Sequence, residues 1–155
     1  MHNPNLKKTI KIEKMTYGGS GLGFNEKGQA VFVNESIPGD EAFIKITEDK
    51  KNYQKAEIFQ LIKKSSIRKE SKCPIAKECG GCQWQQTPYE QQIIWKKEFI
   101  KDAFDKIAKI KIKKDFIFHP SVKNLTYRTK TLLRGRICTD GTIKLGFFKK
   151  KSQEL

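Results

Sequence analysis

The sequence predicts a mainly β protein with one helix, in which a small barrel comes first and a cysteine cluster, a helix and a β-hairpin follow. Three observations support this class. Short apolar stretches separated by glycine and proline fill the first part, a block of cysteines comes next, and a stretch with helical periodicity follows the cysteines. We therefore expect three parts, at residues 1–65, 66–110 and 111–155.

The strands of the predicted barrel lie between about residues 8 and 64. Apolar residues favour strands at 9–17, 30–33, 41–46 and 55–62, with turns at the glycine-rich run 18–23 and at Ile37-Pro38-Gly39-Asp40. Closing such short strands into a barrel removes exposed sheet edges. The glycine run lacks the G-x-G-x-x-G spacing of dinucleotide-binding loops and no crossover helix follows it, so we interpret it as a tight turn between strands.

Three cysteines, Cys73, Cys79 and Cys82, lie within ten positions at the spacing C-x5-C-x2-C. The two glycines between the last pair let the backbone turn tightly around a bound centre. Thiolates select zinc, copper(I) or iron–sulfur clusters. The remaining cysteine, Cys138, lies far downstream. A closed site needs a fourth ligand, so the source of that ligand decides what this chain can bind.

A capped helix is predicted after the cysteines. Thr87 suits the cap, Pro88 the first helical position, and Glu90 completes a capping box. A stripe at helical spacing follows, which we interpret as core: Ile94, Trp95, Phe99, Ala103, Phe104 and Ile107.

A β-hairpin is predicted in the last part. Its first strand carries evenly spaced apolar residues (Leu125, Tyr127, Leu133 and Ile137), and its second carries Ile143, Leu145 and Phe147. Asp140-Gly141 between them favours a two-residue turn.

The charge of the chain favours a polyanionic partner. Lysine and arginine number 32 against 17 acidic residues, a net charge of +15, and nucleic acid is the commonest polyanion. No stretch approaches the roughly 18 consecutive apolar residues that span a membrane. Residues 1–8 lack the apolar segment of a secretory signal. We therefore expect a cytoplasmic protein, in which clustered cysteines bind metal or perform redox chemistry.

The first part resembles the TRAM domain, an RNA-binding β-barrel of the OB type, which implies five strands. The matching stretches are Thr16–Gly23, Val31–Val33 and Ile37–Glu41. The following part resembles bacterial RNA (uracil-5-)-methyltransferases, especially those acting on 23S rRNA. Its matching residues are Cys73-Pro74, Cys79–Gln85, Tyr89, Gln92, Trp95-Lys96 and Tyr127–Lys130, although that family more often has Asn at position 129.

This resemblance implies that Cys73, Cys79 and Cys82 ligate a [4Fe–4S] cluster. The family's fourth cysteine would lie beyond this chain, and Cys138 does not match it, so Cys138 is an alternative fourth ligand or a buried thiol. The S-adenosylmethionine-binding domain, with the nucleophilic cysteine and the general base, would also lie beyond Leu155. Residues 111–155 would then be the start of the family's central β domain, truncated before the S-adenosylmethionine-binding domain. We therefore expect this chain alone to bind RNA and a cluster without catalysing methylation.

Phosphate contacts from lysine and arginine, together with base stacking on aromatic rings, are the predicted mode of RNA binding. Each stacking candidate has core packing as its alternative, and each cationic candidate a solvated strand face. The candidates are Tyr17, Phe24, Tyr53, Phe148, Arg128 and Lys130.

Two other functions are open to the sequence. A stand-alone TRAM-type RNA-binding protein would hold a structural zinc with four thiolates, including Cys138. A radical enzyme of the methylthiotransferase type also carries a TRAM domain, but its clusters use C-x3-C-x2-C spacing and its barrel lies at the other end.

Overall fold

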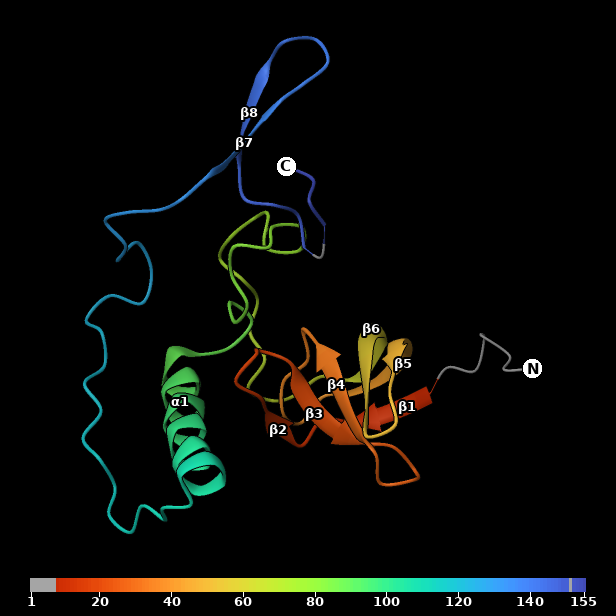
Figure 1. Cartoon of the computed structure of the whole chain (residues 1–155), viewed down its shortest axis with the longest axis vertical. Coiled ribbons are helices and arrows are strands. Elements are labelled where there is room, and N and C mark those ends of the chain that lie inside the picture. Colours follow the sequence, from red (N-terminus) through yellow and green to blue (C-terminus); the bar gives the residue numbers. More distant parts are fainter. Residues whose placement is uncertain (1–7, 151) are drawn as a thin grey trace.

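The computed structural model describes residues 8–150 and 152–155 (Figure 1). The residues on which the expected absence of a secretory signal rests lie almost wholly outside this range. Six strands come first, then a helix that ends in a π-helical turn, then two strands. Their bounds are β1 Lys8–Lys11, β2 Lys14–Met15, β3 Gly21–Phe24, β4 Ala30–Asn34, β5 Glu41–Asp49, β6 Tyr53–Lys63, α1 Tyr89–Ala103, η1 Phe104–Ala108, β7 Arg134–Ile137 and β8 Ile143–Gly146.

The first six strands form one sheet that closes on itself. Their order is β1-β5-β6-β4-β3-β2, so β1 and β2 lie at opposite edges, yet only two residues separate them in sequence. The N–H of Ile12 donates to the carbonyl of Asp40 and that of Glu13 to the carbonyl of Leu22, at 2.9 and 2.8 Å. One bent strand therefore joins both edges, and with β1 and β2 counted together the barrel has the five predicted strands.

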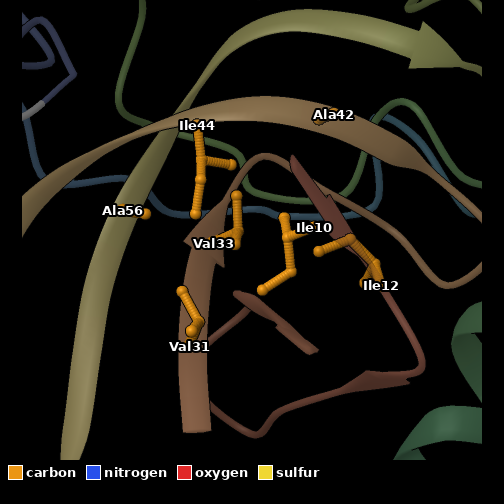
Figure 2. Close-up of a cluster of buried hydrophobic side chains, with 7 residues drawn as sticks. All are labelled: Ile10, Ile12, Val31, Val33, Ala42, Ile44 and Ala56. Carbon is orange, nitrogen blue, oxygen red and sulfur yellow. The ribbon is translucent and has the colours of Figure 1, made fainter. Parts of the chain in front are cut away.

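The barrel encloses a core of aliphatic side chains. Strand alternation turns every second residue inward, and seven buried residues meet there (Figure 2): Ile10, Ile12, Val31, Val33, Ala42, Ile44 and Ala56. Closure also requires a glycine, because a Cβ on Gly23 would lie 2.3 Å from the Lys11 carbonyl oxygen.

The glycine-rich run is part turn and part strand. The N–H of Gly19 donates to the Thr16 carbonyl at 2.9 Å, with Gly19 at a φ of +86°, which confirms the predicted tight turn. Strand β3, however, already begins at Gly21, where we predicted loop. Glycine disfavours a strand by propensity, but here the absent side chains let the strand approach β1 closely.

Helix α1 begins one residue later than predicted and without the predicted cap. Pro88 occupies the N-cap position, and its extended backbone marks the boundary, so it is not the first helical residue. The Thr87 side chain is fully buried and makes no capping hydrogen bond. Instead the side-chain amide of Gln92 donates to the carbonyls of Trp84 and Thr87, both at 3.1 Å, which ties the first turn to the preceding loop.

The predicted core stripe of the helix is only partly buried. Trp95 is 3% exposed and packs with Met15 and Ile37 of the barrel region, and Phe99 packs against this cluster. The other large members of the stripe, Ile94, Phe104 and Ile107, are exposed, contrary to our prediction. The helix therefore meets the barrel around Trp95 and Phe99 and leaves the rest of the stripe uncovered.

The hairpin forms where predicted, but its first strand is shorter and its turn longer. Strand β7 excludes Leu125, Tyr127 and Leu133. The N–H of Cys138 donates to the Thr142 carbonyl at 2.8 Å and that of Gly141 to the Cys138 carbonyl at 3.0 Å, which encloses a three-residue loop. Gly141 takes a φ of +80° there, a conformation that suits glycine. Past position 100, no residue in the described part of the chain is buried.

Candidate nucleic-acid interface and cysteine loop

The outer surface of the barrel carries a row of apolar side chains between two lysines. Because Gly21, Gly23, Val31 and Val33 face the core, their neighbours in β3 and β4 point outward. The strand register places four residues side by side across β2, β3, β4 and β6, in the order Lys14, Leu22, Phe32 and Lys55.

A second row beside it brings two of the predicted stacking residues to the same surface. Phe24 pairs with Ala30, and Ala30 with Tyr53, so the two rings flank a small residue. We call this surface, formed by Phe24, Phe32 and Tyr53, the aromatic face. The rings of Phe32 and Tyr53 meet edge to face, with centroids 5.8 Å apart at an interplanar angle of 77°. Phe24 is exposed and the other two rings are half-buried, and outward-facing rings are a stacking platform for unpaired bases.

Lys55 places an ammonium group beside the aromatic face. Its ammonium lies 5.8 Å from the centroid of the Tyr53 ring and 2.7 Å from a carboxylate oxygen of Glu48. The hydrogen bond from Lys55 lowers the pKa of Glu48, and the same bond raises the pKa of Lys55. Both groups are solvent-exposed, so salt screens this pair and the lysine can exchange its partner for a phosphate.

The other predicted RNA contacts lie elsewhere. Tyr17 is 87% exposed, and its ring meets Phe99 of the helix edge to face at 6.3 Å. Phe148 is half-buried with the Arg134 guanidinium 6.0 Å from its ring. Arg128 and Lys130 are exposed in the irregular segment before β7.

Of the six predicted RNA-contact residues, the structure thus brings only Phe24 and Tyr53 together. Phe32 was not predicted. Strand alternation places it on the side opposite Val31 and Val33, but the alternation alone does not show which side faces the core.

A buried ion pair fixes the segment that leads from the barrel to the cysteines. Asp40 is fully buried and accepts from the backbone N–H of Ile37 at 2.8 Å and of Ser65 at 3.0 Å. The Arg68 guanidinium donates to both of its oxygens, through Nε at 3.1 Å and through Nη2, and also to the Glu35 carbonyl. We call this arrangement the Asp40–Arg68 clasp.

An aromatic junction fixes the segment that leaves the cysteines. The Trp84 ring lies 6.0 Å from that of Trp95 and 5.9 Å from that of Phe99. Gly19 of the barrel turn approaches this junction so closely that a Cβ there would lie 2.9 Å from the Gln83 side-chain oxygen. Both ends of the cysteine loop are therefore held against the barrel.

The cysteine loop, residues 73–82, also contacts the chain after the hairpin. The N–H of Gly80 donates to the Phe148 carbonyl at 2.9 Å, and that of Lys150 donates to the Glu78 carbonyl at 2.7 Å. Lys150 forms an ion pair with Glu35 of the barrel. The loop thus lies between the barrel and the C-terminal residues.

The thiols of this loop are free but not gathered. Cys73 and Cys79 are half-buried and Cys82 is exposed, while Cys138 is half-buried directly after the end of β7, next to the hairpin loop. The N–H of Gly81 donates to Sγ of Cys79 at 3.4 Å. Within residues 8–150 and 152–155, no three Cys, His, Asp or Glu side chains form a metal-binding group. Three cysteine thiols suit a soft metal centre. The loop must close further, however, before all three thiolates can ligate the same centre.

Comparison with known proteins finds similarity over most of the chain. Residues 6–59 match the TRAM domain. The chain is also similar to RNA methyltransferases. The one from Streptococcus mutans is 34% identical, and the match covers 94% of this chain and 32% of the relative. The Thermotoga maritima relative is 34% identical over 78% of this chain and 27% of its own length, and the Thermosynechococcus vestitus relative is 29% identical over 94% of this chain and 32% of its own length. The chain therefore spans about a third of the length of these relatives.

Among solved structures, the tRNA (uracil-54, C5)-methyltransferase of Pyrococcus abyssi in complex with S-adenosyl-L-homocysteine is similar. The match covers 66% of this chain and 22% of that one, at 23% identity and a TM-score of 0.38. No helix among the described residues is long and apolar enough to cross a membrane.

Proposed function

We propose that this chain is the RNA-binding and cluster-binding part of an S-adenosylmethionine-dependent RNA (uracil-5-)-methyltransferase acting on 23S rRNA. The observation that supports RNA binding most directly is the aromatic face, because three rings share one outer surface with Lys14 and Lys55 at its two sides. The net charge of +15 and the TRAM match of residues 6–59 agree with this assignment.

RNA binding on this surface combines two contributions. Unpaired bases stack on the rings of the aromatic face, and each stacked base contributes about 1–3 kcal/mol. Lysines at its margin neutralise phosphates and release counterions, a contribution that does not depend on sequence. The surface therefore favours single-stranded loops over regular duplex, whose bases are already stacked.

The RNA assignment is tested with a fluorescently labelled single-stranded loop from 23S rRNA, by fluorescence anisotropy. Replacing both Phe24 and Tyr53 by alanine is expected to weaken binding about tenfold or more, since two stacking platforms are lost. Phe59→Ala is the matched control, because this exposed ring lies six residues along β6 from Tyr53, about 20 Å away.

An equal effect of Phe59→Ala, or less than a twofold effect of the double variant, would contradict the proposed surface. Tighter binding of a tRNA loop than of the 23S rRNA loop would contradict the proposed rRNA target. Circular dichroism confirms that each variant keeps its secondary structure.

For the metal centre we propose that Cys73, Cys79 and Cys82 hold a [4Fe–4S] cluster, with the fourth ligand from Cys138 or from another part of the enzyme. Support comes from the chemistry of three free thiols on one loop and from the glycines at 80 and 81. Both flanks of that loop are anchored to the barrel, so the cluster would cross-link a segment already in place. Its role in this chain would be structural.

Anaerobic reconstitution with iron and sulfide tests the cluster. We expect a brown protein with about four irons and visible absorption. The Cys79→Ser variant is expected to lose both the iron and the visible absorption. Cys138→Ser tells whether this thiol supplies the fourth ligand. A colourless protein with one zinc would instead favour the stand-alone RNA-binding module with a structural zinc.

In this proposal, the methyl-donor site and the nucleophile for methyl transfer come from outside the stretch described here. S-adenosylmethionine provides the methyl group, and a thiolate attacks C6 of uracil so that C5 becomes nucleophilic. We assign both the cofactor site and that thiolate to the part of the enzyme beyond the stretch matched here.

A further inference from the structure

The hairpin β7–β8 has one aliphatic face and one cationic face. The register pairs Ile137 with Ile143 and Gly135 with Leu145, so these side chains lie on the same side of the two-stranded sheet. The alternating positions, Arg134, Arg136 and Lys144, lie on the other side. We call Ile137, Ile143 and Leu145 the hairpin face.

Both sides of this hairpin are exposed to solvent, and only its cationic side contacts other parts of the chain. Arg136 donates through its guanidinium to the Gln153 carbonyl at 2.8 Å, and the Arg134 guanidinium lies over the Phe148 ring. Ile137, Ile143 and Leu145 are 75%, 69% and 68% exposed. In a folded domain the aliphatic side of such a sheet is expected to be covered, and here it is not.

An isolated two-stranded hairpin is marginally stable in water and needs further strands or a packing partner. Within the described residues this sheet has no third strand, so β7 and β8 each keep an outer edge for pairing. An uncovered aliphatic face beside two strand edges is suited to a β-rich partner that adds strands and packs on the face at once.

We propose that the hairpin face is the docking surface for the remaining part of an RNA methyltransferase, the roughly two thirds of the length that the relatives carry beyond the stretch matched here. This inference rests on the proposed function. A second copy of this chain suits the surface less well. Each copy carries a net charge of +15, so two copies of the chain repel one another.

Docking at the hairpin would also connect the partner to the RNA-binding part. Phe147, directly after β8, lies against Gly81 of the cysteine loop, and a Cβ on Gly81 would be 3.2 Å from its ring. The loop itself is fixed to the barrel through the Asp40–Arg68 clasp and the aromatic junction. A partner that orders the hairpin is therefore linked by direct contacts to the cysteine loop.

The test mixes the full 155-residue chain with the separately expressed remaining part of the Streptococcus mutans relative and measures association by sedimentation velocity. We expect a one-to-one complex whose affinity falls at least tenfold when Ile143 and Leu145 are both replaced by lysine. Lys144→Ala, on the opposite side of the same strand, is the matched control and is expected to leave association unchanged. Hydrogen exchange at the β7 and β8 amides is expected to slow when the partner is added.

Absence of a complex, a complex equally tight with the lysine variant, or a homodimer of the chain that the lysine variant dissolves would each overturn the inference. RNA anisotropy on the same samples separates this failure from failure of the proposed function. If docking fails while RNA binding still depends on Phe24 and Tyr53, only the docking surface is wrong. If RNA binding does not depend on those rings, the proposed function fails by its own test.

Discussion

Asp40 connects the barrel to the segment that carries the cysteines through a single carboxylate. It lies in a turn that was predictable from Pro38 and Gly39, yet its main partner is Arg68, 28 residues later. Two backbone donors and a guanidinium surround the carboxylate, so a fully buried charge is both paired and hydrogen-bonded. Removing one partner leaves the other charge uncompensated in a site that excludes water.

We therefore predict that Asp40→Ala lowers the free energy of unfolding by about 3–5 kcal/mol, because Arg68 would keep a largely buried and unpaired charge. Urea denaturation followed by circular dichroism measures the loss. Glu48→Ala is the control, since the Glu48–Lys55 pair is solvent-exposed and such pairs contribute less than about 1 kcal/mol. Similar losses for the two variants would show that the clasp adds no more than a surface ion pair.

The residues of the candidate site were predictable only where a local pattern marked them. Phe24 and Tyr53 are aromatic residues near lysines, and the structure places both on the aromatic face. Phe32 requires knowledge of which side of β4 faces the core, and Arg68 requires a contact across 28 residues. Neither follows from local spacing, because strand register and long-range pairing are set by the whole barrel.

Helix α1 shows the same limit at the level of an element. Its apolar period correctly predicted a helix and identified Trp95 and Phe99 as packing residues. The period did not show how much of the stripe meets another element, because it reports the direction of side chains and not what lies opposite them. The uncovered members, Ile94, Phe104 and Ile107, follow from a contact with the barrel that is limited to the neighbourhood of Trp95 and Phe99.

Two substitutions in this helical stretch should therefore differ sharply. Trp95→Ala is expected to lower the free energy of unfolding by about 3–5 kcal/mol, since it empties the junction with Met15 and Ile37. Ile107→Ala should change it by less than about 0.5 kcal/mol, because that side chain is 83% exposed. Chemical denaturation compares the two, and near-UV circular dichroism reports the loss of tryptophan packing. A large effect of Ile107→Ala would mean that the end of the helical stretch is covered in solution.

For the whole molecule, the excess of lysine and arginine predicts RNA binding that depends strongly on salt. For single-stranded RNA, the logarithm of the binding constant falls with the logarithm of the salt concentration, with a slope of about −0.7 for each phosphate neutralised. About four phosphate contacts would therefore give a slope near −3, measured by anisotropy across a range of potassium chloride concentrations. A slope near zero would contradict an electrostatic contribution, even if the double variant of Phe24 and Tyr53 weakened binding.

The barrel as a whole was more predictable than the rest of the chain. Its strands are short, locally marked by turns and closed into a core of their own, so local patterns and the final fold agree. After residue 100 the described chain buries no side chain, and sequence patterns there were correct for the hairpin but not for the contacts of its apolar residues. A pattern that predicts burial is informative only when the covering surface belongs to the same chain.

The bent strand that closes the barrel sets an order of events on the ribosome. Strand β1 ends at Lys11, but its partner β5 starts only at Glu41, thirty residues later. At a synthesis rate of about 5–20 residues per second, β1 remains unpaired for about 2–6 s before β5 has been made. Lys8 and Lys11 lie on either side of Ile10 in this unpaired strand. Their positive charges disfavour pairing with the same strand of other nascent chains and so protect against aggregation.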